Sequence, residues 1–458
     1  MAPATSGHDP RTRLLLEAPL TPTLLRLAAP NVLVMFVQAS IGLIEAYFIG
    51  WLGTDALAGI TLVFPIFMLM QMMAGGAMGG GISSAIARAL GGGRREEANA
   101  LALHALVIGA ALGLFFTVVV LCFGEAMYAA MGARGASLAA ALAYSEVIFA
   151  GVVLLWLFNS LANVLRGTGN MAVPAAVTLV GAALVVPLSP CLIFGWGPFP
   201  ELGIAGGATA VLVFYGAGSV AFAAYLWAGR SVVRPSLHSR GFRWLLFREI
   251  LRVGAVAALV TITTNLTIAI ATGFAGTFGP AAIAGYGIGS RLEYLLIPLA
   301  FGFGAPLVAI VGTNIGAGQR DRALRAAWIG AGIVAALTEA IGLAAAAFPH
   351  AWLTLFDSDP AMLEAGALYL RTVGPFYGLF GLGMALYFAS QGAGRLKWPL
   401  LANVMRLAIA VGGGWLALHL GGTLTHVFFA QSIALAVFGL TVAGAVWGGT
   451  WFGRLSYR

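Results

Sequence analysis

The chain has 458 residues, of which 60% are apolar and 9% are charged. Soluble domains carry roughly 25% charged residues, so most of the surface of this protein must face lipid. The formal net charge is +8, but the basic residues are scattered singly between apolar segments, which argues against nucleic-acid binding. Cys122 and Cys191 both lie in apolar runs, which favours buried thiols over a disulfide or a metal site.

The first residues lack the features of a cleavable signal peptide. Asp9, Arg11 and Arg13 are charged, and no compact apolar core is followed by a small-residue cleavage site. Residues 14–27 are compatible either with a surface helix or with a disordered tail that leads into the first span. We predict that residues 1–23 form a cytoplasmic N-terminal segment.

Twelve apolar runs are long enough to cross a membrane as helices. A spanning helix needs roughly 20 apolar residues. The runs that meet this length are residues 24–51, 56–87, 98–123, 138–164, 172–195, 203–229, 250–277, 281–312, 323–347, 362–390, 399–419 and 424–450. The sequence therefore predicts an all-α integral membrane protein with twelve transmembrane helices.

The distribution of charge predicts how the spans are oriented. With twelve spans, 21 of the 24 basic residues lie at the termini or in the even-numbered connections, including the cluster from Arg230 to Arg252 and also Arg406. The other side carries mainly acids, such as Asp55 and Glu125. The positive-inside rule therefore predicts a multi-pass protein of the plasma or inner membrane with both termini in the cytoplasm.

The two halves of the chain repeat each other. Gly53–Gly59 recurs 226 residues later as Gly279–Gly285, and Tyr144 aligns with Tyr369 at an offset of 225. Because each half holds an even number of spans, both copies enter the membrane in the same orientation. The prediction is two six-helix lobes related by a parallel pseudo-two-fold repeat. The expected divisions are the N-terminal segment 1–23, an N-lobe at 24–229, a cytoplasmic linker at 230–249, a C-lobe at 250–450 and a cytoplasmic tail at 451–458.

Three motifs resemble those of the multidrug and toxic compound extrusion (MATE) transporters. The first span ends in Glu45–Gly53, similar to the family's acidic residue, aromatic residue and Gly-x-Leu-Gly. The fourth span ends in Leu165–Asn170, similar to Leu-Arg-Gly-x-Gly, and the eighth in Gly312–Gly318, similar to Gly-x-Asn-x-Gly-Ala-Gly. The resemblance covers nearly the whole chain and implies a secondary active transporter driven by an ion gradient.

The chain departs from the family pattern in both lobes. Members with an ion site in the first lobe often carry a second acid in the fifth span, where this chain has Ser189. Because a sodium site needs several oxygen ligands, this departure favours a proton over sodium as the coupling ion. Other members carry acids in the seventh and tenth spans, where this chain has Thr264, Asn265 and Phe380. That difference argues against ion coupling in the second lobe and leaves Asn265 as a candidate of the substrate cavity.

Glu45 is the strongest candidate for ion coupling. Asn31, Gln38 and Glu45 recur every seven residues, which is two helical turns, so they share one face that must turn away from lipid. A carboxylate inside the bilayer costs about 2.5–3.5 kcal/mol, so an acid retained there faces the bundle interior. Burial favours its protonated form. We therefore expect Glu45 and Gln38 to take part in proton binding; a glutamate held by structural hydrogen bonds is the alternative.

The fourth span adds further polar candidates. Asn159 and Asn163 are four residues apart and share a face, and Asn163 is a candidate partner of Glu45. Glu146 lies at a depth similar to that of Glu45 and corresponds through the repeat to Arg371. This correspondence gives the hypothesis of an ion pair between the lobes, and a satisfied polar residue near a helix end is the alternative.

The eighth span carries Arg291, with Glu293 and Tyr294 close by. An unpaired arginine at this depth is expensive, so a neighbouring acid is expected to neutralise it. Glu293 is two residues away along a helix and points elsewhere, so the partner is expected on another helix or in the substrate. These three residues are candidates for a structural network or for the substrate cavity.

The glycine-rich run Gly75–Gly81 predicts close contact between helices, because small residues let backbones approach in a membrane. No Gly-Lys-Ser/Thr follows it, which argues against a nucleotide-binding loop. An ion gradient, with protons favoured over sodium, is therefore the expected source of energy.

These observations favour an exporter that antiports organic cations or other amphipathic drugs against protons by alternating access. We expect drug-like solutes and membrane lipid as partners, no nucleic acid, no enzymatic activity, no cofactor or metal beyond the coupling ion, and a monomer. A flippase for a lipid-linked saccharide is an alternative, but it needs cavity cations, and the chain offers chiefly Arg291 and Arg371. A membrane-embedded lipid-modifying enzyme is disfavoured because the histidines, such as His104 and His350, are dispersed.

Overall fold

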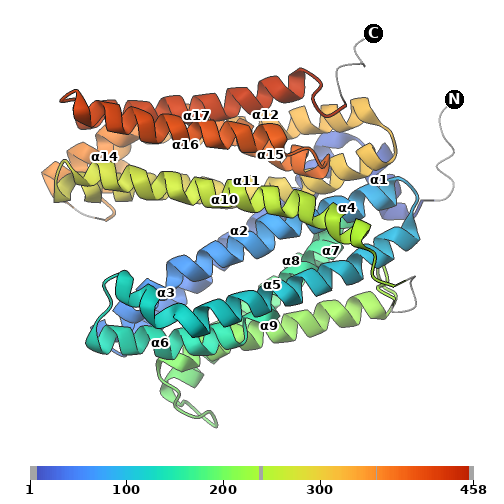
Figure 1. Cartoon of the computed structure of the whole chain (residues 1–458), viewed down its shortest axis with the longest axis horizontal. Coiled ribbons are helices and arrows are strands. Elements are labelled where there is room, and N and C mark those ends of the chain that lie inside the picture. The colour runs from blue at the N-terminus through green and yellow to red at the C-terminus, as the bar shows by residue number, and fades with distance from the viewer. Residues whose placement is uncertain (1–7, 237–240, 357, 453–458) are drawn as a thin grey trace.

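The computed structural model describes residues 8–236, 241–356 and 358–452, and in these ranges all regular structure is helical (Figure 1). The elements of the first half are α1 (Pro10–Glu17), α2 (Leu20–Gly50), α3 (Thr54–Met72), the π-helix η1 (Met73–Met78), α4 (Gly79–Gly91), α5 (Arg95–Ala130), α6 (Gly135–Ala150), α7 (Val152–Gly167), α8 (Ala172–Phe194) and α9 (Ile204–Trp227).

The second half has a similar succession of helices. Its elements are α10 (Trp244–Gly276), α11 (Pro280–Gly316), α12 (Arg320–Ala347), α13 (Pro349–Leu353), α14 (Pro360–Val373), the 3₁₀-helix η2 (Gly374–Phe376), α15 (Tyr377–Gly392), α16 (Lys397–His419) and α17 (Leu424–Trp447).

The number of membrane spans agrees with the twelve predicted from the sequence. In the described residues, eleven helical stretches are long and apolar enough to cross a membrane, including the continuous stretches Thr54–Gly91 and Pro360–Gly392. The twelfth span is the pair α6 and α7, whose axes bend by 47°. The bend falls at Gly151, between the two helices.

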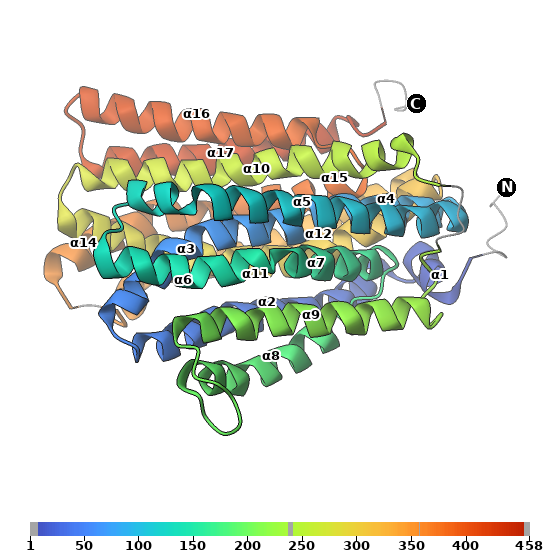
Figure 2. The same cartoon turned by 60° about the horizontal axis from the view of Figure 1, so that its bottom comes forward.

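The molecule has two apolar cores, one for most of each half of the chain. The first core is formed by buried residues between Ile49 and Ile250, and the second mainly by residues from Val253 onward. Figure 2 shows α8 and α9 at one edge of the molecule and α16 and α17 at the other. Large apolar side chains also cover the outside, for example Leu114, Phe115 and Val118 on α5. Such a surface suits lipid as the surrounding solvent.

The N-terminal helix is part of the packed structure. Asp9 caps α1 by accepting hydrogen bonds from the backbone N–H groups of Arg11 and Thr12. Leu15 is buried, and its carbonyl accepts a hydrogen bond of 3.1 Å from the amide of Asn314 on α11. The chain is extended at Ala18, before Pro19, so residues 14–27 form neither one surface helix nor an irregular tail.

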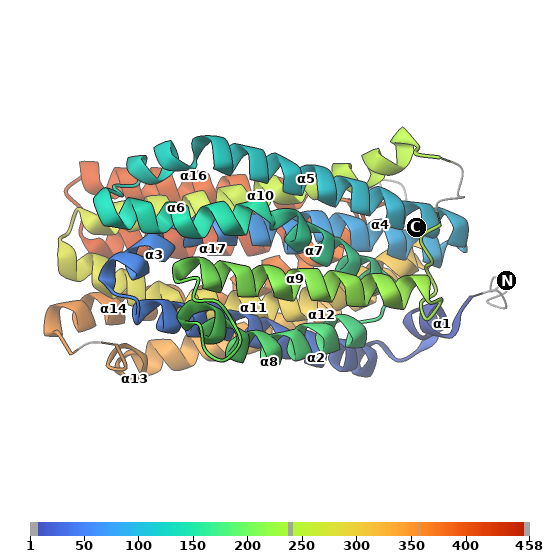
Figure 3. The same cartoon turned by 90° about the horizontal axis from the view of Figure 1, so that it is seen from below.

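The lobes are closed against each other at one end of the bundle. We call it the basic end: it is the end at which α1 lies and at which α9 leads into α10, on the right of Figures 1 and 3. Here α4 crosses α11 so closely that a Cβ on Gly91 would lie 1.9 Å from the Thr313 carbonyl oxygen. The Gln391 amide also donates to the Gly76 carbonyl, at 3.2 Å. Glycine at the crossing allows the backbones to approach this closely.

Candidate functional site

Glu45 lies in the interior of the N-lobe. It is 9% exposed, and its Oε1 accepts a hydrogen bond of 2.7 Å from the hydroxyl of Tyr144 on α6. Gly207 on α9 packs against it, since a Cβ there would lie 3.1 Å from the same oxygen. The carboxyl group therefore sits where α2, α6 and α9 meet, a position at which loss or gain of one proton changes a contact between helices.

The polar residues of α2 contact different lobes although they share a helix face. Gln38 is partly buried. Asn31 is buried, and its amide donates to the Gly302 carbonyl of α11, at 3.3 Å. One half of α2 thus packs on the second lobe while the other half carries Glu45 into the first.

Asn159 and Asn163 contact the π-helix η1 and not Glu45. The Asn163 amide nitrogen donates to the carbonyls of Gly75 and Asn159, and its Oδ1 accepts a hydrogen bond from Ser83. The suggested pairing of Asn163 with Glu45 is therefore wrong. Asn163 lies near the basic end of α7, whereas Glu45 lies near the opposite end of α2.

The hydroxyl partner of Glu45 is Tyr144, which the sequence revealed only as a repeated position. The sequence offered one indication of this contact. Tyr144 lies near the start of the span that also carries Glu146, and the start of this span is at the same membrane depth as the end of α2. Sequence spacing does not indicate which helix packs against which, so the contact was missed.

A second carboxylate, which is largely buried, lies in the C-lobe. Glu293 on α11 forms an ion pair with Arg406 on α16, with 3.1 Å between Oε1 and Nη2. Its Oε2 accepts a hydrogen bond of 3.2 Å from the hydroxyl of Tyr369 on α14. The Arg406 guanidinium also lies over the rings of Phe380 and Phe438, at 5.3 and 5.9 Å from their centroids.

The position of Arg406 corrects the charge distribution expected from the sequence. Its side chain is only 4% exposed, and it lies within α16 rather than in a cytoplasmic connection. The reasoning applied to Arg291, that a cation inside a span needs an acid, holds instead for Arg406. Its depth within the apolar run 399–419 was the signal for this role.

The internal repeat relates the tyrosines that bind the two carboxylates. Tyr144 and Tyr369 occupy equivalent positions in the two halves, and each donates its hydroxyl to a glutamate. The glutamates themselves are not equivalent, because Glu45 lies on the first span of its lobe and Glu293 on the second. The two lobes therefore share the position of the tyrosine but carry the glutamate on different helices.

The other candidates lie outside these two clusters. Arg291 is exposed, and its guanidinium lies over the Phe356 ring at 5.6 Å, so an aromatic ring takes the place of the expected acid. Glu146 and Arg371 are both exposed, and in the described part of the chain neither forms an ion pair, so the pair between the lobes is absent. Asn265 donates to the Thr261 carbonyl of its own helix. The Tyr294 side chain lies outside the described residues.

The chain is similar to known membrane transporters along most of its length. The MatE family model matches residues 30–191 and 257–416, one segment in each half. The FAD transporter of Shewanella oneidensis is 28% identical over 397 residues, which cover 86% of this chain and 87% of that protein. The probable multidrug resistance protein NorM of Thermotoga maritima is 25% identical over 394 residues, covering 84% and 82%.

Solved structures share the whole fold. An outward-facing conformation of a MATE family multidrug resistance transporter superposes with a TM-score of 0.84 at 26% identity, over 97% of this chain and 98% of that one. The twelve spans, the two lobes and the match to both halves lead to one assignment. The chain belongs to the MatE family of membrane transporters.

Proposed function

We propose that this transporter is a plasma-membrane exporter that antiports organic cations or other amphipathic drug-like solutes against protons, working as a monomer with both termini in the cytoplasm. The family assignment and the multidrug relatives support transport of drug-like solutes. The observation that carries the coupling is the buried carboxyl group of Glu45 held by Tyr144. No enzymatic step and no resident cofactor is part of the proposal.

The coupling follows from the contact between α2 and α6. The ionised carboxylate of Glu45 accepts a hydrogen bond from the hydroxyl of Tyr144, and the charge of the acceptor strengthens this bond. A proton that arrives from the end opposite the basic end weakens the acceptor and loosens this contact. The first lobe then changes shape and releases its solute on that side.

Protons suit this site better than sodium. Ser189, at the position where related transporters often carry a second acid, is buried and offers a single hydroxyl. Sodium needs several oxygen ligands. In the described structure, the side-chain hydrogen-bond partner of Glu45 is one tyrosine hydroxyl.

Substitution of Glu45 tests this role directly. Glu45→Gln keeps the size of the side chain but cannot ionise, so proton-driven uptake of a fluorescent cation into proteoliposomes should fall to the level of protein-free vesicles. Glu146→Gln is the matched control, because it removes an exposed acid from the same lobe and should leave uptake unchanged. Full uptake by Glu45→Gln in well-folded protein would remove Glu45 from the mechanism. Replacing the pH gradient by a sodium gradient distinguishes the two ions.

A second candidate substrate comes from the relatives. The FAD transporter of Shewanella oneidensis is 28% identical to this chain, so a flavin dinucleotide is an alternative to an organic cation. Uptake of FAD and of cationic dyes by the same proteoliposomes decides between them. Competition of one with the other would place both in one cavity.

A further inference from the structure

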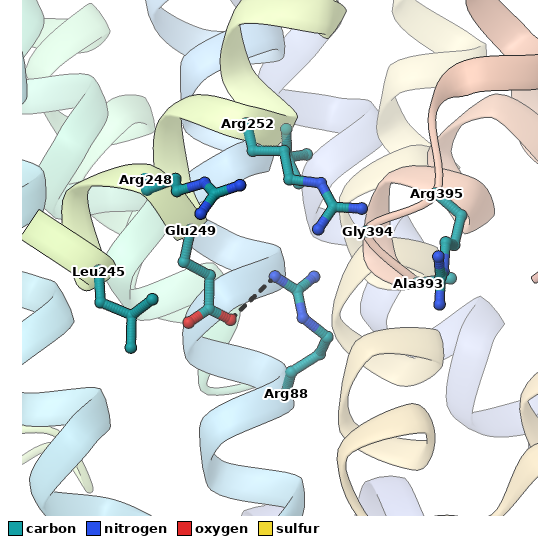
Figure 4. Close-up of a pocket in the computed structure, with 9 residues that line it drawn as sticks. Arg88, Leu245, Arg248, Glu249, Arg252, Ala393, Gly394 and Arg395 are labelled. Carbon is teal, nitrogen blue, oxygen red and sulfur yellow. Dashed lines mark hydrogen bonds and ion pairs between the residues drawn. The ribbon is translucent and has the colours of Figure 1, made fainter.

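A basic pocket lies at the basic end, where the two lobes meet. Its cavity of about 450 Å³ is lined by Arg88 of α4, by the first turns of α10 and by the connection between α15 and α16. Figure 4 shows the guanidinium groups of Arg248 and Arg252 in the upper part of the pocket, Arg395 at the right, and Arg88 below, where it pairs with Glu249. An adjoining cavity of about 380 Å³ shares Arg252 and Arg395.

The pocket carries far more positive than negative charge. Five basic residues line the two cavities against one acid, so the formal charge is 5 − 1 = +4; the basic residues are Arg88, Arg248, Arg252, Arg395 and Lys397. The acid, Glu249, is already paired with Arg88 at 3.2 Å. In the described part of the chain, the other four basic residues are exposed and form no ion pair.

This arrangement is typical of a site for phosphate. Like charges gathered in one pocket repel each other, and an anion between them turns the repulsion into attraction. The planar guanidinium fork matches the oxygens of a phosphate group and forms charge-assisted hydrogen bonds to them. Because the cations come from both sides of the cavity, one phosphate can be held by more than one of them.

The walls of the pocket favour a lipid as the source of that phosphate. Val253, Val256 and Leu396 provide an apolar surface beside the cations, and Trp398 is exposed at the edge. Tryptophan is enriched where a membrane meets water. Basic pockets between transmembrane helices on the cytoplasmic side bind anionic lipid head groups, and we predict that the basic end faces the cytoplasm.

We propose that this pocket binds the phosphate of an anionic phospholipid head group and that the lipid holds the lobes together at the basic end. Arg88 belongs to the N-lobe and already donates to the Gly392 carbonyl of the C-lobe, at 3.0 Å. A phosphate in this pocket, which is lined by Arg88 of the N-lobe and by Arg252 and Arg395 of the C-lobe, adds a second bridge over the same crossing. The bound lipid therefore favours the conformation that is closed at this end.

Lipid binding is measured on purified, full-length protein by native mass spectrometry, with phosphatidylglycerol compared with phosphatidylcholine. The wild type should bind phosphatidylglycerol more tightly. The variant Arg248→Gln/Arg252→Gln/Arg395→Gln should lose roughly tenfold in this affinity, since even one charge-assisted hydrogen bond is worth about that factor. The control Arg230→Gln/Arg234→Gln/Arg325→Gln removes as many exposed arginines elsewhere and should bind as the wild type does.

Two further measurements distinguish a lipid from a soluble phosphate and control for misfolding of the variant. If glycerol phosphate stabilises the wild type against heat as well as phosphatidylglycerol does, and fails to stabilise the glutamine variant, the ligand is a soluble phosphate and the lipid is excluded. The charge-keeping variant with lysine at the three positions should bind more tightly than the glutamine variant, which shows that the glutamine variant loses affinity through lost charge and not through misfolding. Equal lipid affinity of the wild type and the glutamine variant would overturn the proposal. None of these measurements depends on transport.

Discussion

At the scale of residues, the ion pair of Glu293 and Arg406 has the sharpest energetic consequence. Both side chains lie inside the C-lobe, and breaking a buried pair by removing one partner typically costs about 3–5 kcal/mol, because the other charge is left uncompensated. Arg406→Met should therefore lower the thermal unfolding temperature of the detergent-solubilised protein strongly. Adding Glu293→Gln to Arg406→Met should recover part of the loss, because it removes the orphaned charge.

The matched control for this pair is Arg291→Met, which removes an exposed arginine that lies over Phe356. It should change the unfolding temperature little. A double variant that is less stable than Arg406→Met alone would contradict the proposed compensation and would give Glu293 a role independent of the arginine.

These residues also show what the sequence could predict about the candidate site. Glu45 was identified because an acid inside an apolar run is costly unless it is buried among helices. Its partner Tyr144 and the partner of Glu293 were missed, since each contact joins helices whose relative placement is set by tertiary packing. Asn163 was assigned wrongly because sharing a face with another asparagine does not reveal its depth relative to Glu45.

At the scale of elements, the crossing of α4 and α11 depends on glycine. A Cβ on Gly91 would lie 1.9 Å from the carbonyl oxygen of Thr313, too close for any side chain. Gly91→Ala should therefore push the helices apart at the basic end and increase backbone hydrogen exchange there. Gly332→Ala on α12, where a Cβ meets open space, should leave exchange unchanged. Unaltered exchange in Gly91→Ala would mean that the crossing is not a rigid contact.

The spans themselves were predictable, whereas their irregularities were not. Apolar length decides whether a segment can cross the bilayer, so all twelve were found from composition alone. The break at Gly151 and the π-helix at Met73–Met78 alter the hydrogen bonding of a few residues within apolar runs that remain continuous. Hydropathy is insensitive to such changes, yet the π-helix is where Asn159 and Asn163 of α7 contact the chain.

At the scale of the whole molecule, two separate cores joined at one end favour movement of each lobe as a unit. The first core holds residues between Ile49 and Ile250, and the second holds residues from Val253 onward together with a few from α1, α2 and η1. The described close contacts of α4 with α11 and of Gln391 with Gly76 lie toward the basic end. The internal repeat predicted this division, because two copies of one fold can each bury their own apolar faces. The closed end was not predictable, since the same sequence must also form the alternate conformation.

Spin labels test the movement of the lobes. With Cys122 and Cys191 replaced by serine, labels at Asp55 and Thr277 report the separation of the two lobes at the end opposite the basic end. During turnover under a proton gradient, a second population with a shorter distance between these labels should appear, because closure at this end accompanies opening at the other. Labels at Asp55 and Glu125, both in the N-lobe, should keep one distance throughout.

The complementary pair decides whether the movement is a rocking of rigid lobes. Labels at Arg95 and Arg320 flank the crossing at the basic end, one in each lobe, and should gain a longer distance under the conditions that shorten the first pair. Because rigid lobes that pivot about a shared contact cannot open or close at both ends together, the two changes must have opposite sign. Changes of the same sign, or a changing distance within the N-lobe, would instead mean that individual helices bend while the lobes stay in place.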